Sequence, residues 1–311
     1  MARDERDHGM SLLAAFEPIW LLAGAGYLAR RFGLLGDGAD QVLGRFVFHL
    51  AMPAALFLTL STMPLTHLAN RGLLAFAGST ALVIGAGWLI AGRRFHRKPA
   101  ERPIWGMAAG YVNSANLGIP IASQVLGSIS FLAEVVLLQV LLVSPIVLIA
   151  LDRQAAGVRV RRIALIPLRN PVILASLLGV GCSAAGLSAP GFMTGSLRML
   201  AAAAVPVALV ALGASLRSTG EPAGARGELG TLCLLKLVAQ PAVAYLTGLL
   251  LGLSGHQLLA VVVCAGLPTA QNTFIYAQEY RVASPLIGRA VLASTSLSLV
   301  TLAGTAALLG R

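Results

Sequence analysis

The sequence predicts an all-α integral membrane protein. Of its 311 residues, 57% are hydrophobic and only 11% are charged, and the mean hydropathy is +0.82. A soluble domain carries about 25% charged residues, so a water-solvated surface around a single core is excluded. Long apolar runs separated by short loops recur along the whole chain. These runs predict ten membrane-spanning helices.

The spans follow from length, because a bilayer core about 30 Å thick needs roughly 20 mostly apolar residues per helix. Residues 1–10 are charged and predict an N-terminal tail. The first run ends in two arginines, which favours a retained helix over a signal peptide. In order, the runs are Ser11–Ala29, Val42–Leu60, Leu73–Ala91, Ile104–Leu126, Phe131–Leu151, Val172–Ala185, Met199–Leu216, Leu229–Leu251, Leu258–Ala277 and Leu286–Leu309.

The basic residues alternate between successive loops and thereby predict the orientation. Eighteen of the 23 Lys and Arg residues, Lys236 among them, fall in or beside the odd-numbered loops. The other five are Arg3, Arg6, Arg71, Arg198 and Arg311. The positive-inside rule places the eighteen in the cytoplasm, so we expect both termini outside it, in a bacterial-type inner membrane. A nucleic-acid partner is not expected, because a basic binding surface would be contiguous.

The two halves of the chain resemble each other at an offset of 153 residues. Pro18 falls on Pro171, Gly26 falls on Gly179, and residues 51–56 fall on residues 204–209. Chance similarity in an Ala/Leu/Gly-rich chain is the alternative. A duplication predicts one repeat at 11–155 and a second at 166–311, each with five spans. Because five is odd, the second repeat is inverted, which is a transporter architecture with its substrate near the midplane.

Uncharged polar residues and helix breakers gather in the fourth and ninth runs. At mid-bilayer depth such residues are tolerated only where they face protein or a water-filled cavity. The fourth run supplies Asn113, Ser114, Asn116, Gly118 and Pro120, and the ninth supplies Pro268, Gln271, Asn272 and Thr273. These are the predicted substrate-binding residues.

The breakers predict where each of these two helices is interrupted. We expect an unwound link at Asn116 and Gly118, with a half-helix beginning at Pro120. Asn272 or Thr273 is expected to cap a second half-helix. Two half-helix N-termini aimed at one point would form an anion site. Interhelical hydrogen bonds and a simple proline kink are the alternative.

Charged residues inside the runs are few, and most lie near the predicted helix ends: Glu17, His49, Glu134, Lys236, Glu279 and Arg289. Residues near helix ends ordinarily snorkel to the interface. His49 is the candidate for proton coupling, because it precedes the Pro53 kink and an unperturbed histidine has a pKa of about 6.5. A neutral core histidine is the alternative.

Motifs for other chemistries are absent from the sequence. There is no phosphate-binding Gly-Lys-Ser/Thr loop, no His-Glu-x-x-His and no Gly-x-Ser-x-Gly. The three cysteines lie in apolar stretches without metal-ligand spacing. We therefore expect no enzyme activity, no cofactor and no metal.

Several stretches resemble the auxin efflux carrier family, within the larger group of bile-acid, arsenite and auxin-type carriers. The stretch from Asn113 to Pro120, Asn-x-x-x-x-Gly-Ile-Pro, is the most specific of them. The others are residues 25–35, 45–56, 169–171, 206–213 and 277–280. The resemblance covers nearly the whole chain.

The resemblance implies a ten-helix carrier in which the fourth and ninth helices are broken and cross. It also implies a scaffold of the first, second, sixth and seventh helices, a homodimer formed through that scaffold, and small organic anions such as malate, malonate or auxin-like acids as substrates. Gln139 matches a family glutamine that faces the substrate, and a hydrogen bond to a neighbouring helix is its alternative role. The chain departs from the plant members at Thr273, where they carry a proline.

The sequence thus predicts a secondary transporter of small organic anions that works by alternating access. A sodium-coupled organic-anion symporter of the bile-acid type is the alternative within transport. A ligand-binding membrane sensor or scaffold is the alternative from another class, and the short loops leave no room in this sequence for a soluble output domain.

Overall fold

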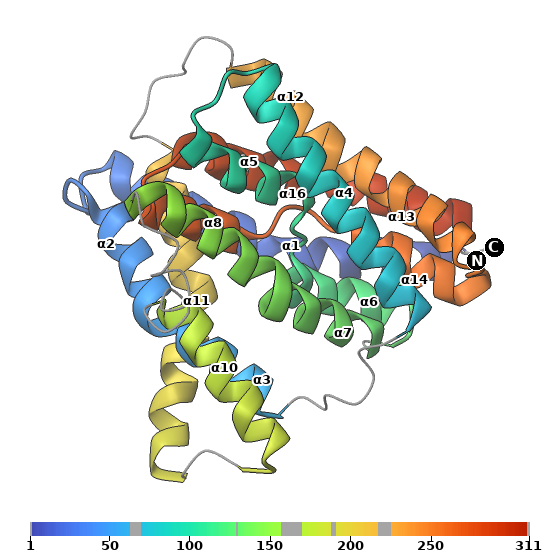
Figure 1. The fold of residues 1–311 in the computed structure, drawn as a ribbon, viewed down its shortest axis with the longest axis horizontal. Coiled ribbons are helices and arrows are strands. Elements are labelled where there is room, and N and C mark those ends of the chain that lie inside the picture. Colours follow the sequence, from blue (N-terminus) through green and yellow to red (C-terminus); the bar gives the residue numbers. More distant parts are fainter. Residues whose placement is uncertain are drawn as a thin grey trace.

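The computed structural model describes residues 2–62, 70–128, 130–156, 170–187, 191–216 and 225–309, and these residues are helical with short connections (Figure 1). No strand occurs among them apart from one isolated β-bridge. The predicted all-α class is therefore confirmed. Several basic residues used to predict the orientation lie outside the described residues: Arg159, Arg161, Arg162, Arg169, Arg217 and Arg311.

The helices of the first half are α1 (Ala2–Arg31), α2 (Ala39–Phe46), η1 (Val47–Ala51), α3 (Met52–Thr62), α4 (Arg71–Arg93), η2 (Pro99–Glu101), α5 (Arg102–Gly110), η3 (Ser114–Gly118), α6 (Ile119–Val125), α7 (Ser130–Leu138), η4 (Gln139–Val143) and α8 (Ser144–Ala156). Those of the second half are α10 (Pro171–Ala184), α11 (Gly191–Ser215), α12 (Ala225–Leu234), η6 (Leu235–Ala239), α13 (Gln240–Leu250), α14 (Gly255–Gly266), α15 (Gln271–Glu279) and α16 (Ser284–Leu309). Because α1 begins at Ala2, the segment expected to be a tail continues the first helix.

Six helical stretches within the described ranges are long and apolar enough to cross a membrane: Ala39–Thr62, Arg71–Arg93, Ser130–Arg153, Met193–Ser215, Arg226–Leu250 and Ser284–Thr305. Two shorter apolar helices are Pro171–Ala184 and Gly255–Gly266. Large apolar side chains such as Leu82, Ile146 and Val300 point outward and are more than half exposed. An outer surface of this kind suits lipid rather than water.

Proline shapes four of these helices. The π-helical segments η1, η3, η4 and η6 each end two residues before a proline, namely Pro53, Pro120, Pro145 and Pro241. Proline lacks an N–H and its ring clashes with the carbonyl four residues earlier, and a widened turn relieves that clash. Wide turns of this type are frequent at functional sites.

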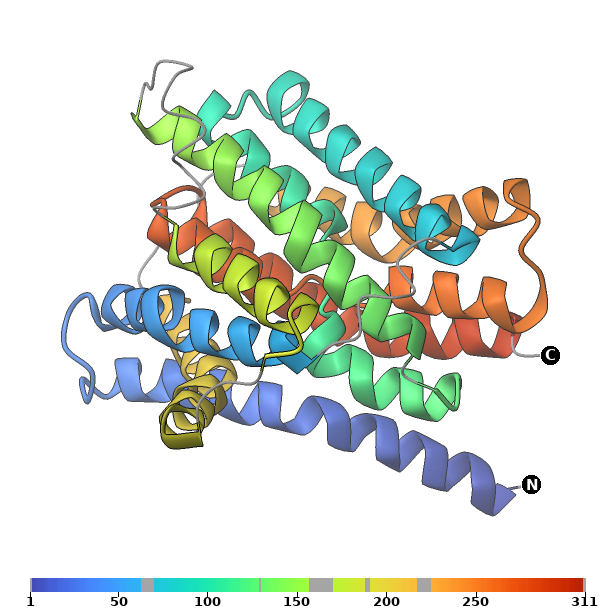
Figure 2. The same ribbon diagram turned by 60° about the horizontal axis from the view of Figure 1, so that its bottom comes forward.

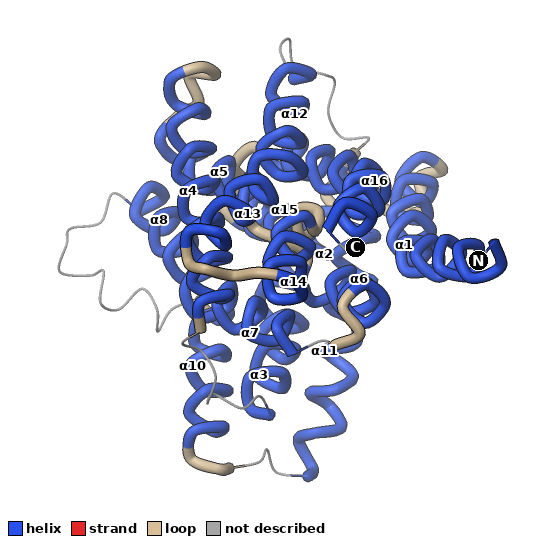
Figure 3. The backbone as a smooth tube through the Cα atoms, turned by 90° about the vertical axis from the view of Figure 1, so that its right-hand side faces the viewer, coloured by secondary structure: helices blue, strands red, loops and turns tan. Residues whose placement is uncertain are grey.

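The helices form two groups. In one group α3, α10 and α11 pack together and α1 packs against α11; Figure 3 shows α3, α10 and α11 projecting to one side of the molecule. The other group contains α4, α5, α8, α12, α13, α14 and α16. The short helices α6 and α15 reach across to the first group, since α6 contacts α1 and α15 contacts α2 and α11.

Two glycines in matching positions of the two halves allow close contacts in the first group. A Cβ on Gly26 of α1 would collide with the backbone of Val210 in α11, and a Cβ on Gly179 of α10 would meet the backbone of Phe57 in α3 at 2.9 Å. These are the two glycines that the internal alignment places in register. Each half therefore uses its matching glycine to pack a helix of the other half.

Both ends of the described chain lie at the same end of the molecule. The beginning of α1 and the end of α16 are at the same end of the molecule in both views (Figures 1 and 2).

An ion pair follows the C-terminal end of α4. There Arg97 donates two hydrogen bonds to Glu228, at 2.8 and 2.9 Å. The Glu228 carboxylate raises the pKa of the Arg97 guanidinium, and it also accepts from the Trp105 indole at 3.1 Å.

Candidate functional site

Two interrupted helices cross at the centre of the molecule. Helix α5 ends at Gly110, residues 111–113 are not helical, and the chain resumes as η3 and α6. Helix α14 ends at Gly266, residues 267–270 are not helical, and α15 begins at Gln271. Val112 and Thr269 form an antiparallel bridge. On either side of it, Asn113 N donates to Pro268 O at 2.8 Å and Ala270 N donates to Tyr111 O at 3.2 Å.

The interruptions do not lie where the helix breakers predicted them. Asn113, not Gly118, is the N-cap of the half-helix formed by η3 and α6. Pro120 is the second residue of α6, downstream of the π-helical turn. The link expected at Asn116 and Gly118 is wrong because proline is tolerated in a first helical turn and here widens the turn before it. In the other helix Ala270 is the N-cap, so a cap at Asn272 or Thr273 is also wrong. Pro268 lies in the extended link itself.

Asn113 joins the two half-helices through its side chain. Its Oδ1 accepts from the Asn116 N–H at 3.4 Å, as an N-cap does, and its Nδ2 donates to Gln271 Oε1 at 3.2 Å. Both Asn113 and Gln271 are buried. The structure thus brings together one predicted residue from each run at the N-termini of two half-helices.

Gln139 holds the backbone of the first link. Its Oε1 accepts from Val112 N at 2.8 Å, and its Nε2 donates to Val112 O at 3.0 Å and to Ser114 Oγ at 2.7 Å. The side chain is buried in the π-helical segment η4. Of the two roles left open by the sequence, this geometry matches the hydrogen bond to a neighbouring helix.

The remaining predicted residues surround this contact. Asn116 and Asn272 are partly exposed, and Asn272 lies beside the Tyr111 hydroxyl. Thr273 is fully buried, and its hydroxyl has no hydrogen-bond partner in the described part of the chain. Gly118 is buried, and a Cβ at this position would meet the Leu132 side chain at 2.7 Å.

Two charged residues of the predicted runs do not lie where the sequence predicted. Lys236 was expected at the cytoplasmic interface, but its side chain is fully buried and donates to Ala265 O at 2.8 Å and to Gln240 Oε1. His49 is not a core residue, since its side chain is 49% exposed. The His49 Nε2 lies 3.7 Å from Glu279 Oε1, and its Nδ1 lies 3.2 Å from Arg45 O.

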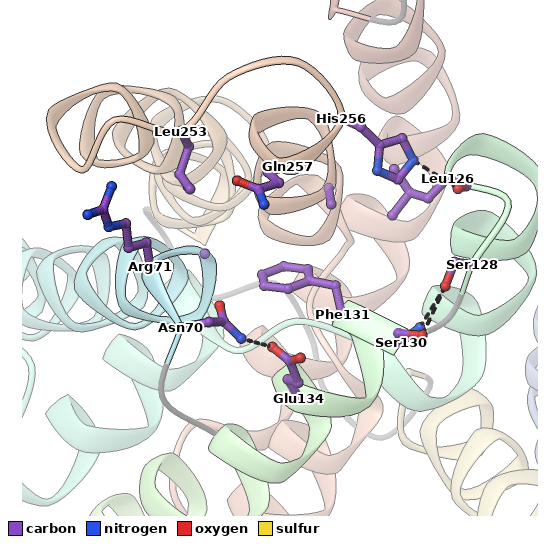
Figure 4. Close-up of a pocket in the computed structure, with 12 residues that line it drawn as sticks. Asn70, Arg71, Leu126, Ser128, Ser130, Phe131, Glu134, Leu253, His256 and Gln257 are labelled. Carbon is purple, nitrogen blue, oxygen red and sulfur yellow. Dashed lines mark hydrogen bonds between the residues drawn. The ribbon is translucent and has the colours of Figure 1, made fainter. Parts of the chain in front are cut away.

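A cavity of about 490 Å³ lies away from the crossing, where α4, α7 and α14 begin (Figure 4). Arg71, Glu134 and His256 contribute its ionisable groups. Asn70 caps α4 by accepting from Leu73 N at 2.8 Å and donates to the Glu134 carboxylate. None of the predicted substrate-binding residues lines this cavity.

Sequence reasoning missed Gln240 and Thr269, which both hold the end of α5, the half-helix before the first link. Gln240 Nε2 donates to Gly110 O at 2.8 Å, and Thr269 Oγ1 donates to Ala108 O at 2.8 Å. Gln240 directly precedes Pro241 in an apolar helix, and Lys236 lies one turn before Gln240. Polar residues shortly before an intramembrane proline were the available signal for Gln240.

Comparison with known proteins assigns the chain to a family. The sequence pattern of the family described as membrane transport protein, which includes the auxin efflux carriers, matches residues 12–305. The chain belongs to this family. Membership makes it a membrane transporter, and its apolar helices make it a multi-pass one. The resemblance stated from the sequence is therefore confirmed.

Three relatives in the membrane transport protein family illustrate its range. A protein of Rhizobium meliloti (strain 1021) named "Putative malonate transporter" is 27% identical over 302 residues, which cover 92% of each chain. "Uncharacterized transporter YfdV" of Escherichia coli (strain K12) is 25% identical over 92% of this chain and 93% of its own. "Probable auxin efflux carrier component 5c" of Oryza sativa subsp. japonica is 31% identical over 147 residues, 46% of this chain and 40% of its own.

Proposed function

We propose that this transporter is a secondary carrier of small organic carboxylates that binds its substrate at the helix crossing. The observation that carries the proposal is the meeting of two half-helix N-termini, at Asn113 and at Ala270, through the Asn113–Gln271 hydrogen bond. Each N-terminus carries a partial positive charge and unpaired N–H groups, which favour an anion. The relative named for malonate supports a carboxylate as that anion.

Uncharged groups would bind the carboxylate at this point. Asn113, Asn116 and Ser114 would contribute from the first half-helix, and Gln271, Asn272 and Thr273 from the second. Asn116 and Asn272 are the partly exposed amides among them, and the Thr273 hydroxyl is a donor without a partner in the described chain. Gln139 and Pro268 would position the link, since both bond its backbone.

The proposed architecture is ten spans in two inverted repeats, residues 11–155 and 166–311. Two features support it. The interrupted segments cross as an antiparallel pair, and the matched glycines Gly26 and Gly179 each pack the opposite half. Alternating access would then move the group containing α4, α5 and α14 against the group containing α3, α10 and α11.

We also propose a bacterial-type inner membrane, both termini outside the cytoplasm, and a homodimer formed through the α3, α10 and α11 group. An even number of spans agrees with the common position of the two chain ends (Figure 1). The excess of basic residues in the odd-numbered loops supports the orientation. Large apolar side chains that remain exposed on α10 and α11, such as Leu177, Leu178 and Met199, support the dimer.

Counterflow in proteoliposomes tests the proposed function. Vesicles that contain the purified protein are loaded with one unlabelled carboxylate and diluted into trace radiolabelled carboxylate. We expect transient accumulation of label for at least one member of a panel of mono- and dicarboxylates that includes malonate and malate. Protein-free vesicles are the control. Failure of every carboxylate, with uptake of an amine or a neutral solute instead, would contradict the proposal.

A further inference from the structure

Lys236 is a charged residue in the interior of a membrane helix. Its side chain is fully buried in the π-helical segment η6. Its Nζ donates to two neutral oxygens, Ala265 O at 2.8 Å and Gln240 Oε1. No carboxylate in the described parts of the chain lies within ion-pair distance of it. A buried ionisable side chain without an acidic partner is costly in a bilayer, and such a residue marks a functional site.

Lys236 lies at the carbonyl ends of α5 and α14, the two half-helices that precede the links. Ala265 is the penultimate residue of α14, and Lys236 binds its carbonyl directly. Gly110 is the last residue of α5, and its carbonyl accepts from Gln240 Nε2 at 2.8 Å, while Gln240 Oε1 accepts from Lys236. The segment η6 contacts both α5 and α14.

Carbonyl ends of interrupted helices are where ion-coupled carriers hold a cation. A helix C-terminus carries about half a negative charge, and carriers with broken helices coordinate sodium or a proton there. In this chain that place is filled by the amino group of Lys236. A neutral side chain such as methionine would fill similar space with no charge to desolvate.

We propose that Lys236 is a positioning residue that acts as a tethered cation at the crossing and takes the place of a coupled sodium ion. Its charge stabilises the carbonyl ends of α5 and α14 on one side of the crossing and offsets the charge of the anion on the other. Transport of the anion then needs no sodium. This inference rests on the proposed function, since it assigns the positive charge that accompanies the anion.

The test is carboxylate counterflow in sodium chloride and in choline chloride, with thermal unfolding of each protein measured in parallel. We expect equal wild-type rates in the two salts. Lys236→Met should weaken substrate binding by roughly ten-fold or more, because even one unit charge is worth about 1.4 kcal/mol at close range. Lys236→Arg should restore most of the affinity. Lys98→Met, which removes the other lysine of the chain from an exposed position, is the matched control and should behave as wild type.

Two results would overturn the proposal. One is a wild-type rate that rises several-fold with sodium, a measurement that needs no variant to fold. The other is a folded Lys236→Met protein that binds substrate as tightly as wild type. Absence of carboxylate counterflow in either salt would instead contradict the proposed function and remove the basis of this inference with it.

Discussion

At the scale of single residues, widened helical turns carry the polar groups. Each π-helical segment before a proline holds or borders one such residue: His49 in η1, Asn116 in η3, Gln139 in η4 and Lys236 in η6. A turn that is wider than an α-helix re-aims side chains and leaves backbone groups to be satisfied by neighbours. The proline positions are therefore as informative about the site as the polar residues themselves.

Gln139→Ala separates the two roles of this residue. The Val112 N–H has the Gln139 oxygen as its acceptor, and leaving a buried donor unpaired costs about 1–3 kcal/mol. We therefore expect a lower thermal unfolding temperature together with slower counterflow, and an intermediate effect for Gln139→Glu, which keeps the acceptor. Wild-type unfolding combined with weakened substrate binding would show instead that Gln139 contacts the substrate directly.

His49→Gln tests the proposed proton coupling. A protonated His49 ring is attracted to the Glu279 carboxylate 3.7 Å away, and a neutral ring is not. We expect the variant to lose the dependence of uptake on an imposed pH gradient while exchange of preloaded substrate continues. His256→Gln, which alters the remote cavity (Figure 4), serves as control. If uptake by His49→Gln follows the gradient as wild type does, His49 does not carry the proton and potential-driven anion movement is the mechanism to retain.

At the scale of elements, paired glycines set how closely helices from the two halves of the chain approach one another. Gly26→Ala and Gly179→Ala each place a methyl group against the backbone of a facing helix, and such overpacking costs about 1–3 kcal/mol. Both variants should unfold at lower temperature in detergent. Gly24 and Gly181 lie two residues away on the same helices, where a Cβ meets nothing within 4 Å. Gly24→Ala and Gly181→Ala should therefore unfold at the wild-type temperature. Equal behaviour of all four variants would argue against the matched packing of the repeats.

Hydropathy was sufficient to predict the helices but not the interruptions. Apolar runs locate α4 or α16 because lipid requires one apolar stretch per span. Residues 111–113 contain no helix breaker, and they leave the helix because Pro268, Ala270 and Gln139 bond their backbone. Those partners are remote in sequence, so local reasoning chose Gly118 and Pro120 instead. Lys236 was misplaced for the same reason, since its partner Ala265 is 29 residues away.

At the scale of the whole molecule, the charge distribution predicts the orientation. Ala100 and Ser128 flank the interrupted helix of α5 and α6 on its two sides, so one span separates them. With Cys182, Cys233 and Cys264 replaced, single cysteines at these positions are treated with a membrane-impermeant maleimide on intact cells. We expect labelling at 128 and protection at 100. The reverse pattern would invert the topology, and labelling of both would contradict a span between them.

The binding of an anion at the crossing of the two interrupted helices is the central claim, and the affinity of carboxylate for two asparagine variants tests it most directly. Asn113→Ala and Asn116→Ala should each weaken binding by about 1–3 kcal/mol, because a charged ligand loses a polar partner. Asn116 is partly exposed, so its variant should unfold at the wild-type temperature, whereas Asn113→Ala also leaves Gln271 without its donor and should unfold earlier. Wild-type affinity in both variants would place the substrate elsewhere and leave the two asparagines with the structural role of joining helices.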